Sequence, residues 1–116
     1  ALREAAETLG NPHHVGITQS KDSFYGQHAP ERMPVASRLQ DRWKAWVDGG
    51  AICSEMEAST IFTISSMHRT RAAGIMLIMA ITGERERGVY RDLTNLIKTS
   101  IEAVKILIEK DKKAGK

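Results

Sequence analysis

The sequence predicts an α/β fold, in which a mixed sheet carries helices on its faces. Three observations support it. Short segments of strand character alternate with segments of helical periodicity along the chain. Residues 74–81 are almost wholly apolar, as expected of a central strand covered on both faces. One apolar stripe predicts a long helix over residues 92–112, formed by Leu93, Leu96, Ile97, Ile101, Val104, Leu107 and Ile108.

The first part of the chain predicts a helix, a strand and a long connection. Residues 1–9 have helical composition and end at Gly10, which suits the left-handed position after a helix. Residues 15–20 predict a strand. Residues 21–33 include Gly26 and are long for a connector, which favours a functional loop over a simple turn.

The middle of the chain predicts a helix, a strand and a second helix. Pro34 is well placed to begin the first helix, which a pair of glycines ends at residues 49–50. We interpret its two tryptophans as core anchors rather than as ligand-stacking platforms; the apolar positions at helical spacing are Val35, Leu39, Trp43 and Trp46. Residues 51–54 predict a short strand, and residues 58–69 a helix.

Composition favours one soluble globular domain. The chain has 116 residues, of which 41% are hydrophobic and 27% charged, and a formal net charge of +3. No apolar run approaches the roughly 20 residues that cross a bilayer. We interpret the terminal lysines as a solvated helix end, not as a surface for nucleic acid or membrane; they are Lys110, Lys112, Lys113 and Lys116.

A single cysteine limits the kinds of site and the cellular compartment that the sequence indicates. Cys53 excludes an internal disulfide framework and a cysteine-based zinc cluster, so we expect a cytoplasmic protein in which Cys53 is a small buried hydrophobe. We expect no metal, because no ligand pattern joins the histidines His13, His14, His28 and His68. The chain opens in helical composition without an initiator Met, which suggests a fragment.

Two glutamates stand where the second strand passes into a helix. Glu55 and Glu57 are two apart, so in an extended segment both carboxylates can face one pocket. The alternative is that both open the helix because anions suit its positive end.

The segment SEMEAS at residues 54–59 resembles the E-M-E signature of the nucleoside phosphorylase and nucleosidase superfamily. The segment SKDSFYGQ at residues 20–27 resembles the base-binding loop of uridine phosphorylases and precedes the first motif, as it does in that family. The resemblance implies a nucleoside-phosphorylase-like fold, with residues 1–116 as the C-terminal part of a single domain.

The resemblance assigns roles to five residues. Glu57 grips the ribose hydroxyls, Met56 lies against sugar and base, and Glu55 shapes the pocket. Phe24 stacks on the pyrimidine and Gln27 reads it, since one carboxamide can pair with a carbonyl and a ring N–H together. The alternative for Phe24 is that its ring only pins the loop to the core.

Arginines are the point at which the chain departs from the family pattern. Many uridine phosphorylases have an arginine two residues after the glutamine, where this chain has Ala29. His28 and Arg32 are candidates to supply that donor. A further family arginine follows the central strand, where Arg85 and Arg87 are candidates. The alternative for both is an ordinary solvated charge.

The mechanism implied is phosphorolysis of uridine to uracil and ribose 1-phosphate, a pentosyltransferase reaction of pyrimidine salvage. Positioned donors stabilise the charge of the leaving uracil, with Gln27, Arg32 and Arg85 as the expected catalytic residues and no cofactor. The resemblance implies a homo-oligomer, a hexamer built from dimers. Because no segment matches the family's phosphate site, we expect the 116-residue chain alone to be inactive.

Three alternatives stay open. A purine nucleoside phosphorylase or nucleosidase shares the E-M-E motif but carries an aspartate after the central strand, where residues 81–84 read Ile-Thr-Gly-Glu. A truncated, non-catalytic chain would only bind nucleosides or serve as an oligomer subunit. A carboxylate-pair glycosidase needs two acidic groups at a controlled separation.

Overall fold

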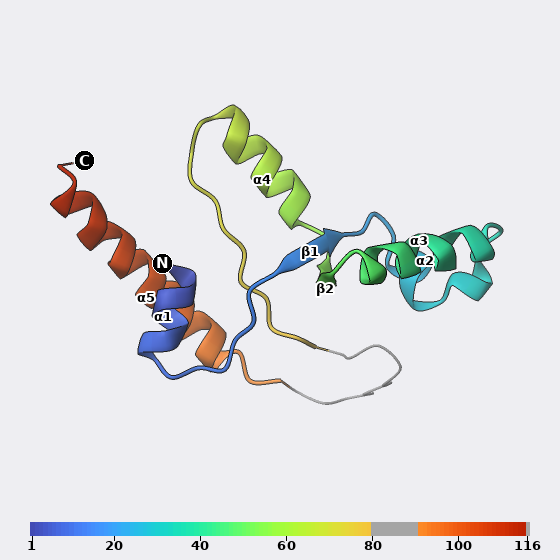
Figure 1. Ribbon diagram of the computed structural model, residues 1–116, viewed down its shortest axis with the longest axis horizontal. Helices are drawn as coiled ribbons and strands as arrows, with labels where there is room; N and C mark the ends of the chain where they lie inside the picture. Colours follow the sequence, from blue (N-terminus) through green and yellow to red (C-terminus); the bar gives the residue numbers. More distant parts are fainter. Residues whose placement is uncertain (80–90, 116) are drawn as a thin grey trace. The chain divides into compact units, whose positions relative to one another are not determined.

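The computed structural model describes residues 1–79 and 91–115, which fall into two compact units. One unit comprises Ala1–Val15 and Ala73–Lys116, and the other comprises Gly16–Ala72. Figure 1 shows the helices and strands of both units. Helices and a small parallel sheet together confirm the α/β prediction.

The first unit pairs a short helix with a long one. Helix α1, Leu2–Thr8, packs against α5, Thr94–Lys113, and small residues allow the close approach. Ala5 and Ala6 on α1 are buried, as are Thr99 and Ala103 on α5. Asn11, just past α1, donates from Nδ2 to the hydroxyl of Thr99 at 2.9 Å. The helix predicted over residues 92–112 is therefore confirmed to within two residues at its start.

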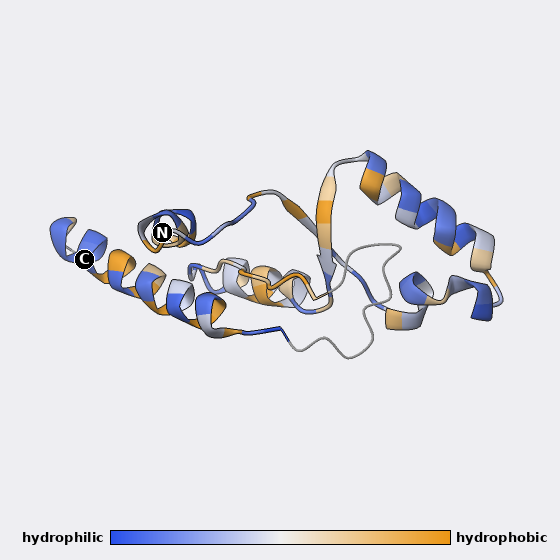
Figure 2. Cartoon of the chain, turned by 90° about the horizontal axis from the view of Figure 1, so that it is seen from below, coloured by the Kyte–Doolittle hydropathy of each residue, from blue (hydrophilic) through white to orange (hydrophobic). Residues whose placement is uncertain are grey.

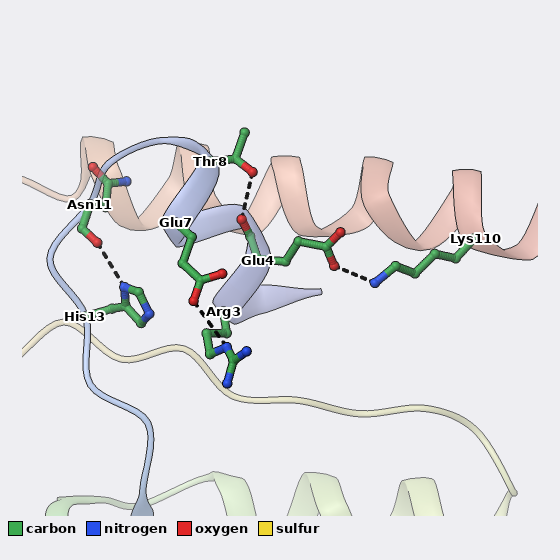
Figure 3. A network of polar contacts seen from close by, with 7 residues as sticks. All are labelled: Arg3, Glu4, Glu7, Thr8, Asn11, His13 and Lys110. Carbon is green, nitrogen blue, oxygen red and sulfur yellow. Dashed lines mark hydrogen bonds and ion pairs between the residues drawn. The ribbon is translucent and has the colours of Figure 1, made fainter.

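Polar contacts at the surface accompany this helix pair (Figure 3). Glu4 on α1 forms an ion pair with Lys110 near the end of α5. Arg3 pairs with Glu7 one turn along α1, at 3.3 Å between Nε and Oε1. Because these groups are about half exposed or more, each pair contributes little to stability.

The apolar stripe that predicted α5 is not the face that α1 covers. Apolar and polar residues alternate along α5 (Figure 2). In the part of the chain that the structure describes, five members of the stripe are about half exposed: Leu93, Ile97, Ile101, Val104 and Ile108. Periodicity located the helix correctly, but the small residues Thr99 and Ala103 make the close contact.

The second unit is built on a parallel pair of strands. Strand β1, Ile17–Ser20, pairs with β2, Ala51–Glu55, and the register places Ser20 opposite Glu55. Helix α3, Ala36–Asp48, lies in the crossover between them, and α4, Ala58–Met67, follows β2. Both strands and both helices confirm the predicted order.

The predicted loop over residues 21–33 contains two short helices. Helix α2 spans Phe24–His28 and the 3₁₀ turn η1 spans Pro30–Arg32. Ser23 caps α2, because its hydroxyl accepts the N–H of Gly26 at 3.0 Å. A Cβ on the buried Gly26 would lie 3.1 Å from the Ser23 side chain, so this tight cap favours glycine.

Three predictions about burial and pairing are wrong. Residues 74–79 form no strand: they have no strand partner among the described residues, and a strand needs one for its backbone groups. Trp46 is 43% exposed and Trp43 half-buried, because both rings line cavities instead of filling a closed core. Cys53 is also only half-buried, in a sheet that the structure describes with two strands.

No helix in residues 1–79 or 91–115 is long and apolar enough to span a bilayer.

Candidate functional site

The two sequence motifs meet at one edge of the parallel strand pair. Pairing of Ser20 with Glu55 brings the ends of β1 and β2 together, and the N–H of Lys21 donates to the Glu55 carbonyl at 2.8 Å. Residues 20–27 and 54–59 therefore leave the sheet side by side. This is the edge at which ligands bind in α/β folds.

The half-buried Glu55 carboxylate makes its hydrogen bonds within the protein. It accepts hydrogen bonds from the Ser20 hydroxyl and from the backbone N–H groups of Glu57 and Ala58, the latter two both at 2.6 Å. Burial favours its neutral form, but these donors and nearby Lys21 together lower the pKa of Glu55 below its ordinary value. Glu55 thus joins β1 to the start of α4 and orders the motif around it.

The Glu57 carboxylate has different surroundings. Glu57 is the residue before α4 and its side chain is exposed, with Oε2 accepting the Met56 N–H at 3.2 Å. Its backbone has already left the extended conformation, with ψ of −30°, so the two-residue strand period ends at Glu55. The extended backbone on which the expectation of one shared pocket rested therefore ends before Glu57, and the shared pocket stays a prediction. Met56 beside them is 41% exposed.

Aromatic rings gather on the exposed side of α2. The Phe24 ring is 51% exposed and contacts the Tyr25 ring edge-on, with centroids 5.5 Å apart. It also lies 4.4 Å from the His28 ring at an interplanar angle of 34°. A half-exposed ring is accessible to a planar ligand, and stacking on Phe24 stays a prediction.

Gln27 lines a small cavity against α3. The cavity has a volume of about 40 Å³ and is lined also by Gln19, Leu39, Arg42, Trp43 and Trp46, among others. The Oε1 atoms of Gln27 and Gln19 are buried, and neither accepts a hydrogen bond in the part of the chain that the structure describes. A buried acceptor without a donor costs free energy, so a ligand or water that donates there is favoured.

A second cavity lies between β1 and α4. Its volume is about 330 Å³. Ser20 and Trp46 line it together with Thr18, Gln19, Ala58, Ser59 and Phe62. Neither cavity is lined by Glu55 or Glu57, whereas Trp46 lines both.

Lys21 connects the two motifs, and sequence reasoning did not single it out. Its Nζ lies 3.2 Å from Nε2 of His28 and 3.1 Å from Oγ of Ser54, and 5.7 Å from the centre of the Phe24 ring. Burial lowers the pKa of Lys21, against the carboxylates of Glu55 and Glu57, which raise it. The strand register brings Ser54 to Lys21, 33 positions away, and no spacing in the sequence indicated that contact.

The arginine candidates are not gathered around Gln27. Arg32 is exposed on η1, and its guanidinium carbon lies 5.5 Å from the centre of the Tyr25 ring. Arg32 lines neither cavity. Arg85 and Arg87 lie outside the described residues. Of the candidates for the missing donor, His28 alone is shown in contact with Phe24.

Within the described ranges, no group of three His, Cys, Asp or Glu residues could hold a metal ion.

Comparison with known proteins gives consistent matches along the chain. The family model described as the phosphorylase superfamily matches residues 1–110. A uridine phosphorylase of Treponema pallidum is 38% identical over 115 residues, which cover 96% of this chain and 45% of that protein. A uridine phosphorylase of Thermococcus kodakarensis is 38% identical over 125 residues, with coverages of 100% and 43%.

A relative with a different name matches at lower identity. A DeoD-type purine nucleoside phosphorylase of Jannaschia sp. is 27% identical over 103 residues, which cover 83% of this chain and 39% of that protein. The chain thus spans less than half the length of these two uridine phosphorylases.

Proposed function

The chain belongs to the phosphorylase superfamily, and we propose that the protein containing it cleaves uridine with phosphate to uracil and ribose 1-phosphate. One observation carries the proposal: the segment that resembles a base-binding loop and the E-M-E segment leave adjacent strands at one edge of the sheet. Support also comes from the two relatives named uridine phosphorylase at 38% identity. In this proposal residues 1–116 are the C-terminal part of one catalytic domain.

The exposed side chains at this edge suit a nucleoside. The exposed Glu57 carboxylate can accept from both hydroxyls of a cis-diol, at roughly 1.5 to 3 kcal/mol for each charge-assisted bond. Met56 is exposed beside it and lies against the sugar. Phe24 stacks on the pyrimidine, and the Gln27 carboxamide pairs with a carbonyl and the ring N–H. Glu55 holds this arrangement through its backbone contacts.

In the proposed reaction, a phosphate oxygen forms a bond to the anomeric carbon while the bond from that carbon to the base nitrogen breaks. The electron pair of the broken bond leaves with uracil, whose growing negative charge needs hydrogen-bond donors. Gln27, Arg32 and Arg85 are the proposed donors, with His28 as the alternative to Arg32. The substrates are uridine and inorganic phosphate, the setting is the cytoplasm, and the protein is a homo-oligomer.

The test is the phosphate dependence of uracil release. We expect the whole protein to release uracil from uridine only when phosphate is present, and the isolated 116-residue chain to release none. Release without phosphate would instead support a hydrolytic glycosidase. Turnover by the short chain, with its mass verified, would contradict the proposal that the phosphate site lies elsewhere in the protein.

A purine nucleoside is the second candidate substrate, favoured by the match to the DeoD-type relative. A purine leaves more readily when N7 is protonated, and Glu84 is the acidic residue of the chain that follows the apolar segment 74–81. Its surroundings lie outside the described residues.

A further inference from the structure

Lys21 makes contacts that have no role in the proposed reaction. Its Nζ lies 3.2 Å from His28 Nε2 on α2 and 3.1 Å from Ser54 Oγ on β2. The ammonium group therefore joins the base-binding segment to the E-M-E segment. Lys21 and Ser54 are half-buried, so this link is partly shielded from water.

The contact with Lys21 has a consequence for the His28 ring. A lysine ammonium donates hydrogen bonds and accepts none, so the nitrogen that faces it must be the accepting one. In a neutral ring with Nε2 as the acceptor, the hydrogen is carried by Nδ1. Burial and then the charge of Lys21 lower the pKa of His28, and both favour this neutral form. The carboxylates of Glu55 and Glu57 favour the ammonium form of Lys21.

The His28 ring stands where it can meet a stacked ligand. It follows Gln27 in α2 and lies 4.4 Å from the Phe24 ring. No described residue accepts a hydrogen bond from its Nδ1. Arg32, the other candidate donor, has its guanidinium over Tyr25 instead.

We propose that Lys21 locks His28 in the Nδ1–H tautomer, and that this N–H donates to a ring carbonyl of the pyrimidine base that stacks on Phe24. His28 is then a specificity-determining residue and Lys21 a positioning residue. The proposal rests on the proposed function only for the identity of the ligand. The tautomer follows from the contact with Lys21 alone.

The tautomer is tested by ¹⁵N NMR of labelled histidines in the whole protein, with His28→Phe used to assign the His28 signals. We expect a protonated Nδ1 and a bare Nε2 at neutral pH, and loss of this preference in Lys21→Met. Lys21→Arg keeps a cationic donor and should preserve it. A protonated Nε2 in the wild-type protein would overturn the proposal. So would a Lys21→Met spectrum that matches the wild type.

Contact with the base is tested by adding free uracil to the same sample. We expect the His28 Nδ1 signal to shift as uracil binds, while the signals of His14 do not. An unchanged Nδ1 signal at saturating uracil would overturn the assignment of His28 to the base.

Kinetics with uridine give a second readout. His28→Phe keeps a ring beside Phe24 but has no N–H, and kcat/KM should fall about tenfold, as expected for one unmatched carbonyl. Lys21→Met alone should lower kcat/KM less than His28→Phe does. Added to His28→Phe in a double variant, it should lower kcat/KM little further, because both changes remove the same contact. His14→Phe and Lys44→Met are matched controls on exposed residues. Additive losses would mean that Lys21 does not act through His28.

The pH profile separates positioning from folding. In Lys21→Met the pKa of His28 should rise toward its ordinary value, since one of the two causes that lower it is removed. Titration of the His28 ¹⁵N signals against pH measures this change, and Lys21→Arg should keep the pKa lowered. A His28 pKa that is the same in wild type and Lys21→Met would contradict the proposal. If the wild-type protein cleaves no uridine, the proposed function fails, whereas the NMR spectra and the uracil titration still decide the role of His28.

Discussion

Two glutamates separated by one residue have opposite environments at this site. Glu55 accepts from a hydroxyl and two backbone N–H groups, whereas Glu57 is exposed. A carboxylate whose hydrogen-bonding capacity is used within the protein is suited to ordering its neighbours. An exposed carboxylate at the same strand edge is suited to a ligand, which is why we assign the sugar to Glu57.

Glu57→Ala in the whole protein should lower kcat/KM for uridine about a hundredfold or more, because two charge-assisted bonds are lost. The loss for 2′-deoxyuridine should be clearly smaller, since that substrate lacks one of the hydroxyls. Steady-state kinetics with both nucleosides measure the difference, and Glu109→Ala, on the exposed end of α5, is the control. Equal losses for the two substrates would assign Glu57 a structural role.

Glu55→Gln should lower the stability of the protein at neutral pH by about 1 to 2 kcal/mol, because charge-assisted bonds become neutral ones. The folded pKa of Glu55 is below its ordinary value of 4.5, so its contribution is fully present above that pH and is lost as pH falls through the folded pKa. Melting temperatures of wild type and variant should therefore converge below pH 4.5. A difference in melting temperature that stays constant down to acid pH would refute the role of the carboxylate. Glu7→Gln is the control variant.

Helix ends form the clearest pattern at the scale of elements. After α1 and α3 the chain turns through Gly10 and Gly50 with φ of 66° and 90°. After α4 the same turn is made by Arg69, with φ of 53°. There the N–H of Thr70 returns to the Ser65 carbonyl at 2.9 Å, a bond typical of left-handed helix ends.

Arg69→Gly should therefore raise the free energy of unfolding by about 0.5 to 1 kcal/mol. The change removes the strain of a left-handed residue other than glycine, and part of that gain is offset because glycine increases the entropy of the unfolded chain. Gly50→Ala is the matched variant with the opposite expected effect, a loss of stability. A Cβ there would meet nothing within 4 Å, so its cost of about 1 to 2 kcal/mol is conformational alone. Chemical denaturation measures whether the free energy of unfolding rises in Arg69→Gly and falls in Gly50→Ala. A destabilising Arg69→Gly would mean that the arginine side chain contributes more than its backbone strain costs.

On the scale of the whole molecule, the only apolar side chains that the described residues bury are small, namely Ala5, Ala6, Ala58 and Ala103. The polar side chain of Thr99 is buried as well. Base choice is a property of the whole protein as well, and it is tested on the whole protein.

The whole protein should prefer uridine to inosine in kcat/KM. Gly83 has no side chain that could protonate a purine, and uracil can leave as an anion held by donors. Measuring kcat/KM for uridine and for inosine across a range of pH tests this preference. A preference for inosine that disappears in Glu84→Gln would reverse the assignment, because it would identify Glu84 as the acid that serves a purine.

Local patterns were enough to predict most elements and to locate the two motifs. Pro34 and the glycines at residues 49–50 bracketed α3, and apolar periodicity placed α5, because caps and periodicity are properties of neighbouring residues. The apolar run at residues 74–81 predicted a strand that is absent over 74–79. Hydrophobicity alone does not supply the neighbouring strand whose backbone must pair with it.

By itself, the sequence determined the α/β order, the family resemblance and the identity of the residues at the two motifs. Only the tertiary structure decided what those residues do to one another. The parallel register sets Ser20 against Glu55, which turns one glutamate inward and leaves Glu57 exposed. It also brings Lys21 to Ser54, 33 positions away, while Lys21 contacts His28. Contacts between distant residues depend on strand pairing, and pairing is settled by the energy of the whole fold rather than by any local pattern.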